Sequence, residues 1–177
     1  FAMIAMLEGM GADAIGINCS LGPKALGGVV REYIKYSSTP IILKPNAGLP
    51  KSVDGKTVFD VDSIEFSNEI AQLVKEGVGI IGGCCGTTPE YIKKLVAVTK
   101  DITAVPVTKK NISCVSSYTH AVEFGKKPVL IGERINPTGK KRFKEALKAN
   151  DIDYILKEGI AQQEKGVGVL DVNVGLP

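Results

Sequence analysis

Short apolar segments alternate with amphipathic segments along most of this chain, and this alternation restricts the possible folds more than any other feature. Strand-like runs lie at residues 13–18, 40–44 and 78–81. Apolar residues at helical spacing fill the intervals between these runs. Alternating strands and helices are typical of parallel βα units. The sequence therefore predicts an α/β protein.

Three of the predicted helices have clear starts or apolar faces. One opens at Gly22-Pro23, and its apolar face is expected to hold Leu26, Val29, Val30, Tyr33 and Ile34. Another covers 61–76 after a polar stretch, with an apolar face of Ile64, Ile70, Leu73 and Val74. The next begins at a Thr87 or Thr88 cap, is followed by Pro89 and Glu90, and ends near Lys100.

A second βα series follows a region without clear periodicity. From 101 to 127 the pattern fades, which indicates an interdomain linker with a small hairpin near the β-prone stretch 112–118. Strands are then predicted at 128–132 and 168–173, with helices at 140–148 and 151–165. The chain also begins with the end of a helix and without methionine, so we expect a fragment of a longer protein.

The chain is too short to contain two complete (β/α)₈ barrels. A (β/α)₈ TIM barrel takes roughly 250 residues, whereas the chain has 177. We therefore predict parts of two such barrels in tandem. Their expected boundaries are 1–104 for the C-terminal part of the first barrel, 105–127 for the linker and hairpin, and 128–177 for the N-terminal part of the second.

Three cysteines follow predicted strands of the first series. Cys19 comes after the strand at 13–18, and the adjacent pair Cys84-Cys85 follows the strand at 78–81 within a glycine-rich loop. Neighbouring cysteines do not easily reach the torsion of a relaxed disulfide. The carboxyl ends of barrel strands meet at one mouth, so the three thiols are expected to lie together. Three thiolates with one open position are the ligand set of a catalytic zinc.

A purely structural interpretation of these cysteines remains open. Cysteine is among the most buried residue types and often acts as a small apolar side chain in a core. We prefer that interpretation for Cys114, and the spacing alone supports it as well as the metal site for Cys84-Cys85. No CxxC ligand pattern is present. The glycines on both sides of the pair favour a loop that turns tightly or approaches a ligand.

A second set of polar residues lies at strand ends of the later series. Glu133 and Asn136 follow the first strand, and Asp171 and Asn173 lie at the end of the second. Carboxylates and amides can bind the donor and acceptor edge of a planar heterocycle. The alternative is local: Glu133 pairs with Arg134, and Asn136 begins an Asx turn before Pro137. The recurrence on two consecutive strands favours a ligand site.

Composition excludes several other classes of function. The net charge of +3 is too small and too dispersed for nucleic-acid binding. The apolar opening is shorter than the roughly 20 residues of a membrane span and has no basic leader. Four cysteines outside a small disulfide framework indicate a reducing cytoplasm. We expect Lys140-Lys141-Arg142 to form a solvated helix face, and His120 to have a surface or packing role.

These motifs, in their order and spacing, resemble the family of cobalamin-dependent methionine synthases along nearly the whole chain. The stretches that carry the resemblance are 16–19 (GINC), 45–48 (PNAG), 82–89 (GGCCGTTP), 132–139 (GERINPTG) and 171–175 (DVNVG). The first three resemble the end of the homocysteine-binding barrel of that family. The last two resemble the start of its methyltetrahydrofolate-binding barrel.

The resemblance implies a site and a reaction. Cys19, Cys84 and Cys85 would bind Zn²⁺, with the homocysteine sulfur as the fourth ligand, and the bound thiolate would accept a methyl group from methylcobalamin. 5-Methyltetrahydrofolate would then remethylate the cobalamin. Glu133, Asn136, Asp171 and Asn173 would lie in or beside the pterin site. The cobalamin-binding domain would be a partner in the same parent chain or in trans, and the isolated fragment is expected to be inactive and to lack a sharp cooperative melt.

Three alternatives remain. A cobalamin-independent homocysteine S-methyltransferase would keep the cysteines but would not need the second series. Another corrinoid-linked methyltransferase component would use a different methyl acceptor. A structural zinc or redox thiol module would have a closed metal shell or none, and no response to homocysteine.

Overall fold

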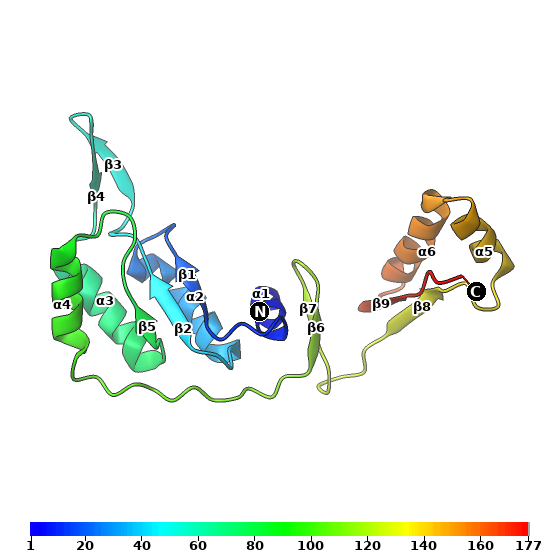
Figure 1. Ribbon diagram of the computed structural model, residues 1–177, viewed down its shortest axis with the longest axis horizontal. Coiled ribbons are helices and arrows are strands. Elements are labelled where there is room, and N and C mark those ends of the chain that lie inside the picture. Colours follow the sequence, from blue (N-terminus) through cyan, green and yellow to red (C-terminus); the bar gives the residue numbers. More distant parts are fainter. Residues whose placement is uncertain (177) are drawn as a thin grey trace. The chain divides into compact units, whose positions relative to one another are not determined.

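The computed structural model describes residues 1–176 (Figure 1). Two compact units divide the chain: residues 1–111 with 116–121 form the first, and 112–115 with the segment from Val122 onward form the second. None of the helices in residues 1–176 combines the length and apolar character that crossing a membrane requires.

The elements follow the predicted alternation. In the first unit they are α1 (Ala2–Gly9), β1 (Ile15–Asn18), α2 (Pro23–Tyr36), β2 (Ile41–Lys44), β3 (Pro50–Val53), β4 (Lys56–Phe59), α3 (Ser63–Glu76), β5 (Ile80–Ile81) and α4 (Pro89–Thr99). They are followed by the paired strands β6 (Cys114–Ser116) and β7 (Ala121–Glu123), and then by β8 (Ile131–Ile135), α5 (Lys141–Lys148), α6 (Ile152–Glu164) and β9 (Val169–Val172). The predicted α/β class is confirmed.

A parallel sheet in the order β1-β2-β5 organises the first unit. Ile17 lies opposite Leu43, and Leu43 lies opposite Ile81. Figure 1 shows α2 and α3 near this sheet and α4 beside α3. In the second unit β8 pairs with β9 in parallel, and α6 packs against β8. None of the sheets formed by residues 1–176 closes into a barrel. The assignment of the two units to two barrels therefore stays a prediction.

Helix α3 illustrates how the local sequence sets an element and how packing selects its buried face. The Asp62 carboxylate accepts hydrogen bonds from the N–H groups of Ile64 and Glu65, and Gly77 ends the helix with φ of 136°. Phe66 and Ile70 are fully buried, whereas Ile64 is 60% exposed. The predicted place of Ile64 on the apolar face is therefore wrong. Val29 of α2, which is 49% exposed, is a second such error.

A hairpin that the sequence analysis missed lies between β2 and α3. Strands β3 and β4 pair antiparallel across Asp54 and Gly55, which have φ of 51° and 74°. Two residues with positive φ, in the order Asp-Gly, are the signature of a type I′ hairpin. The Asp54-Gly55 dipeptide was therefore the signal in the sequence for a hairpin within the polar stretch before residue 61. Figure 1 shows the hairpin projecting beyond the carboxyl end of β2.

In the second unit the first strand begins later than predicted. β8 starts at Ile131 rather than at Pro128, so Glu133 lies within the strand and not after it. The hydrogen-bonding partner β9 begins at Val169, close to its predicted start. The shift changes the surroundings of Glu133, because its backbone now belongs to the sheet.

Candidate functional site

The sulfur atoms of Cys19, Cys84 and Cys85 form one cluster in the first unit. All three Sγ atoms lie within 4.8 Å of one another. The Cys19 and Cys85 sulfurs are 3.8 Å apart, and those of Cys84 and Cys85 are 4.0 Å apart. Cys19 follows β1 and the pair follows β5, so the parallel sheet brings their loops to the same end. All three thiols are free.

The loop after β2 holds the two cysteine loops together. The Cys19 N–H donates to the Lys44 carbonyl at 2.9 Å, and the Cys84 N–H donates to the Pro45 carbonyl at 2.9 Å. The Cys85 carbonyl accepts from the Ala47 N–H at 2.9 Å. The middle strand of the sheet therefore determines how closely the cysteines of the outer strands approach.

Asn46, for which no role was predicted, lies beside the cysteine cluster. Its side chain is buried, and its Oδ1 accepts a hydrogen bond from the Cys85 N–H at 3.1 Å. Its own N–H donates to the Leu21 carbonyl at 3.0 Å, in the loop that follows Cys19. The signals in the sequence were its place in the PNAG stretch at 45–48, which carries part of the family resemblance, and an amide side chain in a loop that contains proline and glycine.

Unusual backbone geometry surrounds the cluster. Cys19 and Ser20 have φ of 67° and 68°, in the left-handed region that costs energy for residues other than glycine. Gly86 also has positive φ, and a β-carbon added there would lie 2.3 Å from the ring of Phe59. The Phe59 ring at the end of the β3–β4 hairpin thus packs directly on the residue after Cys85. This geometry keeps the turn at Cys85 tight.

The thiols of Cys19 and Cys85 do not ionise independently. The pKa of Cys19 is lowered, first by the hydrogen bond from the Ser20 backbone and then by the side chains of Cys85 and Cys84. The pKa of Cys85 is raised, chiefly by its hydrogen bond with the Cys19 sulfur and then by its hydrogen bond with the Cys84 sulfur. Cys19 therefore loses its proton more readily than Cys85, and a negative charge on Cys85 meets repulsion from the charge on Cys19. A bound dication would remove that repulsion.

The donor set fits zinc. A tetrahedral centre with Zn–S bonds of about 2.3 Å places its sulfurs about 3.8 Å apart. The observed separations of 3.8 and 4.0 Å are close to that value, and the remaining pair lies within 4.8 Å. Three sulfurs leave one tetrahedral position for a further ligand. Cys114, half-buried in β6, is not part of the cluster.

The four residues of the predicted heterocycle site lie within or just after β8 and β9. Glu133 lies within β8 and Asp171 within β9, while Asn136 and Asn173 each follow one of these strands. The Asn173 N–H donates to the Ile135 carbonyl at 2.8 Å, which continues the pairing of the two strands. Among residues 1–176, none of these four side chains is hydrogen-bonded to another of the set.

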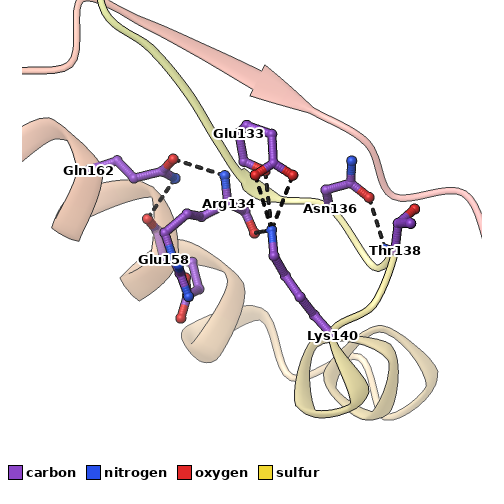
Figure 2. Close-up of polar contacts among 7 residues, drawn as sticks. All are labelled: Glu133, Arg134, Asn136, Thr138, Lys140, Glu158 and Gln162. Atoms are coloured by element: carbon purple, nitrogen blue, oxygen red, sulfur yellow. Dashed lines mark hydrogen bonds and ion pairs between the residues drawn. The ribbon is translucent and has the colours of Figure 1, made fainter.

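The contacts of these four side chains agree in part with the alternative that they have only local structural roles. Asn136 Oδ1 accepts from the Thr138 N–H at 2.9 Å, so the Asx turn is present, and Asn173 Oδ1 accepts from the Gly175 N–H at 3.0 Å. The proposed Glu133–Arg134 pair does not form. Arg134 instead pairs with Glu158 at 3.3 Å (Figure 2). The remaining lone pairs of both asparagines are available to a ligand.

Contrary to the prediction, the Lys140 side chain does not point freely into solvent from a helix face. Its ammonium group lies 3.3 Å from Glu133 Oε1 and donates to the Glu133 and Arg134 carbonyls, each at 3.3 Å (Figure 2). The Glu133 carboxylate thus carries a neighbouring positive charge. His120 is exposed, and its Nδ1 lies 2.7 Å from Thr119 Oγ1, so the predicted surface role is confirmed.

Residues 1–99 match the sequence model of the homocysteine S-methyltransferase family, and the three-cysteine cluster lies within this range. The chain belongs to the homocysteine S-methyltransferase family.

Two similar proteins extend the comparison past residue 99. The chain is 34% identical over 181 aligned positions to the methionine synthase of Mycobacterium leprae (strain TN) and 32% identical over 176 positions to the methionine synthase of Mycobacterium tuberculosis (strain ATCC 25618 / H37Rv). Each match covers 98% of this chain and 15% of the relative, so the chain spans only a small part of their length. The predicted resemblance to methionine synthases is confirmed.

Proposed function

We propose that this chain contributes the homocysteine-activating centre and the beginning of the methyltetrahydrofolate site of a cobalamin-dependent methionine synthase. The observation that carries the proposal is the approach of three free thiols within 4.8 Å at the ends of parallel strands. The similarity to methionine synthases beyond residue 99 favours this function over a cobalamin-independent methyltransferase, which does not need the second unit. The reducing cytoplasm would keep the thiols free.

Cys19, Cys84 and Cys85 would hold Zn²⁺ and leave one position open to the homocysteine sulfur. Zinc supplies the Lewis acidity that removes the thiol proton near neutral pH, so a protein base is not required. Three thiolates would outweigh the charge of one dication, so the site would carry a net negative charge that favours an electron-rich substrate sulfur. The Cys85 N–H bond to Asn46 and the tight turn at Gly86 hold the third sulfur in place.

The overall reaction joins two methyl transfers. The homocysteine thiolate would take the methyl group of methylcobalamin to give methionine, and 5-methyltetrahydrofolate would return a methyl group to the cobalamin. The cobalamin-binding domain would lie in the same parent chain or in a separate partner. Glu133, Asn136, Asp171 and Asn173 would bind the pterin ring, because carboxylates and amides match its donor and acceptor edge.

Zinc-edge X-ray absorption of the full-length protein tests the metal centre. We expect three sulfur ligands and one light atom without substrate, and four sulfur ligands after homocysteine is added. Homoserine, which has a hydroxyl in place of the thiol, is the matched control and should leave three sulfurs. An unchanged shell with homocysteine would contradict the proposed activation and favour a structural zinc or redox module.

Substitution of Glu133 tests the pterin site separately. In the full-length protein, Glu133→Gln should raise the KM for 5-methyltetrahydrofolate by about tenfold or more, because a charge-assisted hydrogen bond to the pterin is lost. Methyl transfer from methylcobalamin to homocysteine should not change. Glu145→Gln, an exposed carboxylate of α5, is the control. Equal KM values for the two variants would remove Glu133 from the site.

A further inference from the structure

In a regular strand, Glu133 and Asn136 would lie on opposite faces of β8. Side chains alternate between the two faces of a strand, so residues three positions apart point in opposite directions. A single pterin could not contact both side chains from one face of a regular strand. The two residues reach a common face only if the strand gains or loses one position between them.

The register of β8 against β9 shows this extra position. Gly132 lies opposite Leu170 and Ile135 lies opposite Val172, so three steps along β8 match two steps along β9. This two-against-one arrangement is a β-bulge, which bends a strand and redirects its side chains. The bulge comprises Glu133 and Arg134.

Contacts on α6 show which residues the bulge brings to the same face. A β-carbon added at Gly132 would lie 2.5 Å from Gln162 Oε1, and one added at Gly159 of α6 would lie 3.5 Å from Ile135 Cδ1. Gly132 and Ile135 therefore both face α6, although they are three residues apart. The next residue after each, Glu133 and Asn136, then lies on the opposite face.

Asp171 and Asn173 belong to that same face. A β-carbon added at Gly159 would lie 3.7 Å from Leu170 Cδ1, so Leu170 points toward α6. Its neighbour Asp171 points away, and Asn173, two residues later, follows the same direction. The bulge is thus the feature that aligns the β8 pair with the β9 pair.

Gln162 stabilises the bulge through its side-chain amide. Because the ladder is interrupted, the Arg134 N–H has no partner on β9 and donates to Gln162 Oε1 at 3.0 Å. Gln162 Nε2 donates to the Glu158 carbonyl at 2.9 Å, which fixes the amide orientation (Figure 2). The Gln162 side chain is 5% exposed. Without this acceptor the partly buried N–H group would lose its protein partner, which costs free energy.

We propose that Gln162 is a positioning residue for the pterin site: its buried amide holds the β8 bulge that places Glu133 and Asn136 on one face with Asp171 and Asn173. Gln162 itself touches no substrate. The inference rests on the proposed function, since the pterin is the ligand that would contact these four aligned side chains.

The test compares two glutamine variants of α6 in the full-length protein. Gln162→Met keeps the length of the side chain but removes the acceptor oxygen, and it should raise the KM for 5-methyltetrahydrofolate about tenfold, the value of one misplaced charged hydrogen bond. Gln163→Met, at an exposed neighbouring position, should behave as wild type. Transfer from methylcobalamin to homocysteine should be unchanged in both variants.

Two further variants separate positioning from general stability. Gln162→Glu retains the acceptor oxygen for the Arg134 N–H but loses the Nε2 donor to the Glu158 carbonyl, so its KM should lie between those of wild type and Gln162→Met. Gly132→Ala adds a β-carbon that displaces the Gln162 amide without removing it. This variant should raise the KM for 5-methyltetrahydrofolate as Gln162→Met does. It provides the test if Gln162→Met does not fold. A wild-type KM in folded Gln162→Met or in Gly132→Ala would overturn the proposal, as would equal losses in both half-reactions. If the wild-type protein does not use 5-methyltetrahydrofolate at all, the proposed function fails instead.

Discussion

Replacement of Cys85 by alanine is expected to remove bound zinc from the full-length protein and to lower methyl transfer from methylcobalamin to homocysteine by about a thousandfold or more. The estimate follows from the several kcal/mol that a metal contributes by generating a nucleophile, at about 1.4 kcal/mol for each tenfold in rate. Cys85 is the central sulfur of the cluster, because it lies 3.8 Å from Cys19 and 4.0 Å from Cys84. Without Cys85 only two thiol ligands remain, which is fewer than the three protein ligands of a catalytic zinc site.

Cys114→Ala is the matched control for this prediction. Cys114 is also a free, partly buried cysteine, but it lies in β6, outside the cluster. Zinc content from elemental analysis and the rate with methylcobalamin should both equal those of wild type. Retention of zinc and activity in Cys85→Ala would show that this thiol is not a ligand. Loss of both in Cys114→Ala would mean that the cysteines act by a different arrangement.

Phe66→Ala is expected to destabilise the first unit by about 3–5 kcal/mol, the usual cost of removing a buried phenylalanine. Phe66 is fully buried in α3, and its ring meets that of Tyr91 edge-on at 5.3 Å. The contact joins α3 to α4, the helix that follows the Cys84-Cys85 loop. Hydrogen exchange of α3 and α4 peptides in the full-length protein should show a corresponding fall in the free energy of opening.

Ile64→Ala provides a control on the same helix. Ile64 is 60% exposed, so its truncation should change the free energy of opening by no more than about 0.5 kcal/mol. Comparable effects of the two substitutions would contradict the packing of α3 described above and would restore the face predicted from periodicity.

Prediction from the sequence succeeded where a local pattern has one physical meaning. The apolar runs before Cys19 and before Cys84 were predicted as parallel strands, and β1 and β5 lie there. The predicted meeting of the cysteines at the carboxyl ends of these strands agrees with the three sulfurs, which lie within 4.8 Å of one another. Their role as metal ligands was less determined, because a free cysteine also occurs as a small apolar residue in protein cores.

Periodicity could not choose between neighbouring faces of a helix. Ile64 and Phe66 are both apolar and both lie in α3, yet only Phe66 is buried, because the position of α4 decides which side is covered. The β3–β4 hairpin was missed for a related reason. Its strands are exposed, so they lack the apolar alternation that marks a half-buried strand.

The sequence by itself determined the order of the elements, the strand ends that carry Cys19 and Cys84-Cys85, and the residue types available to a metal and a heterocycle. Only the tertiary structure decided that the loop after β2 and Asn46 hold both cysteine loops. It also decided that a bulge held by Gln162 brings Glu133 and Asn136 to one face. These features depend on hydrogen bonds between residues far apart in the chain, and such bonds leave no periodic signal in the sequence.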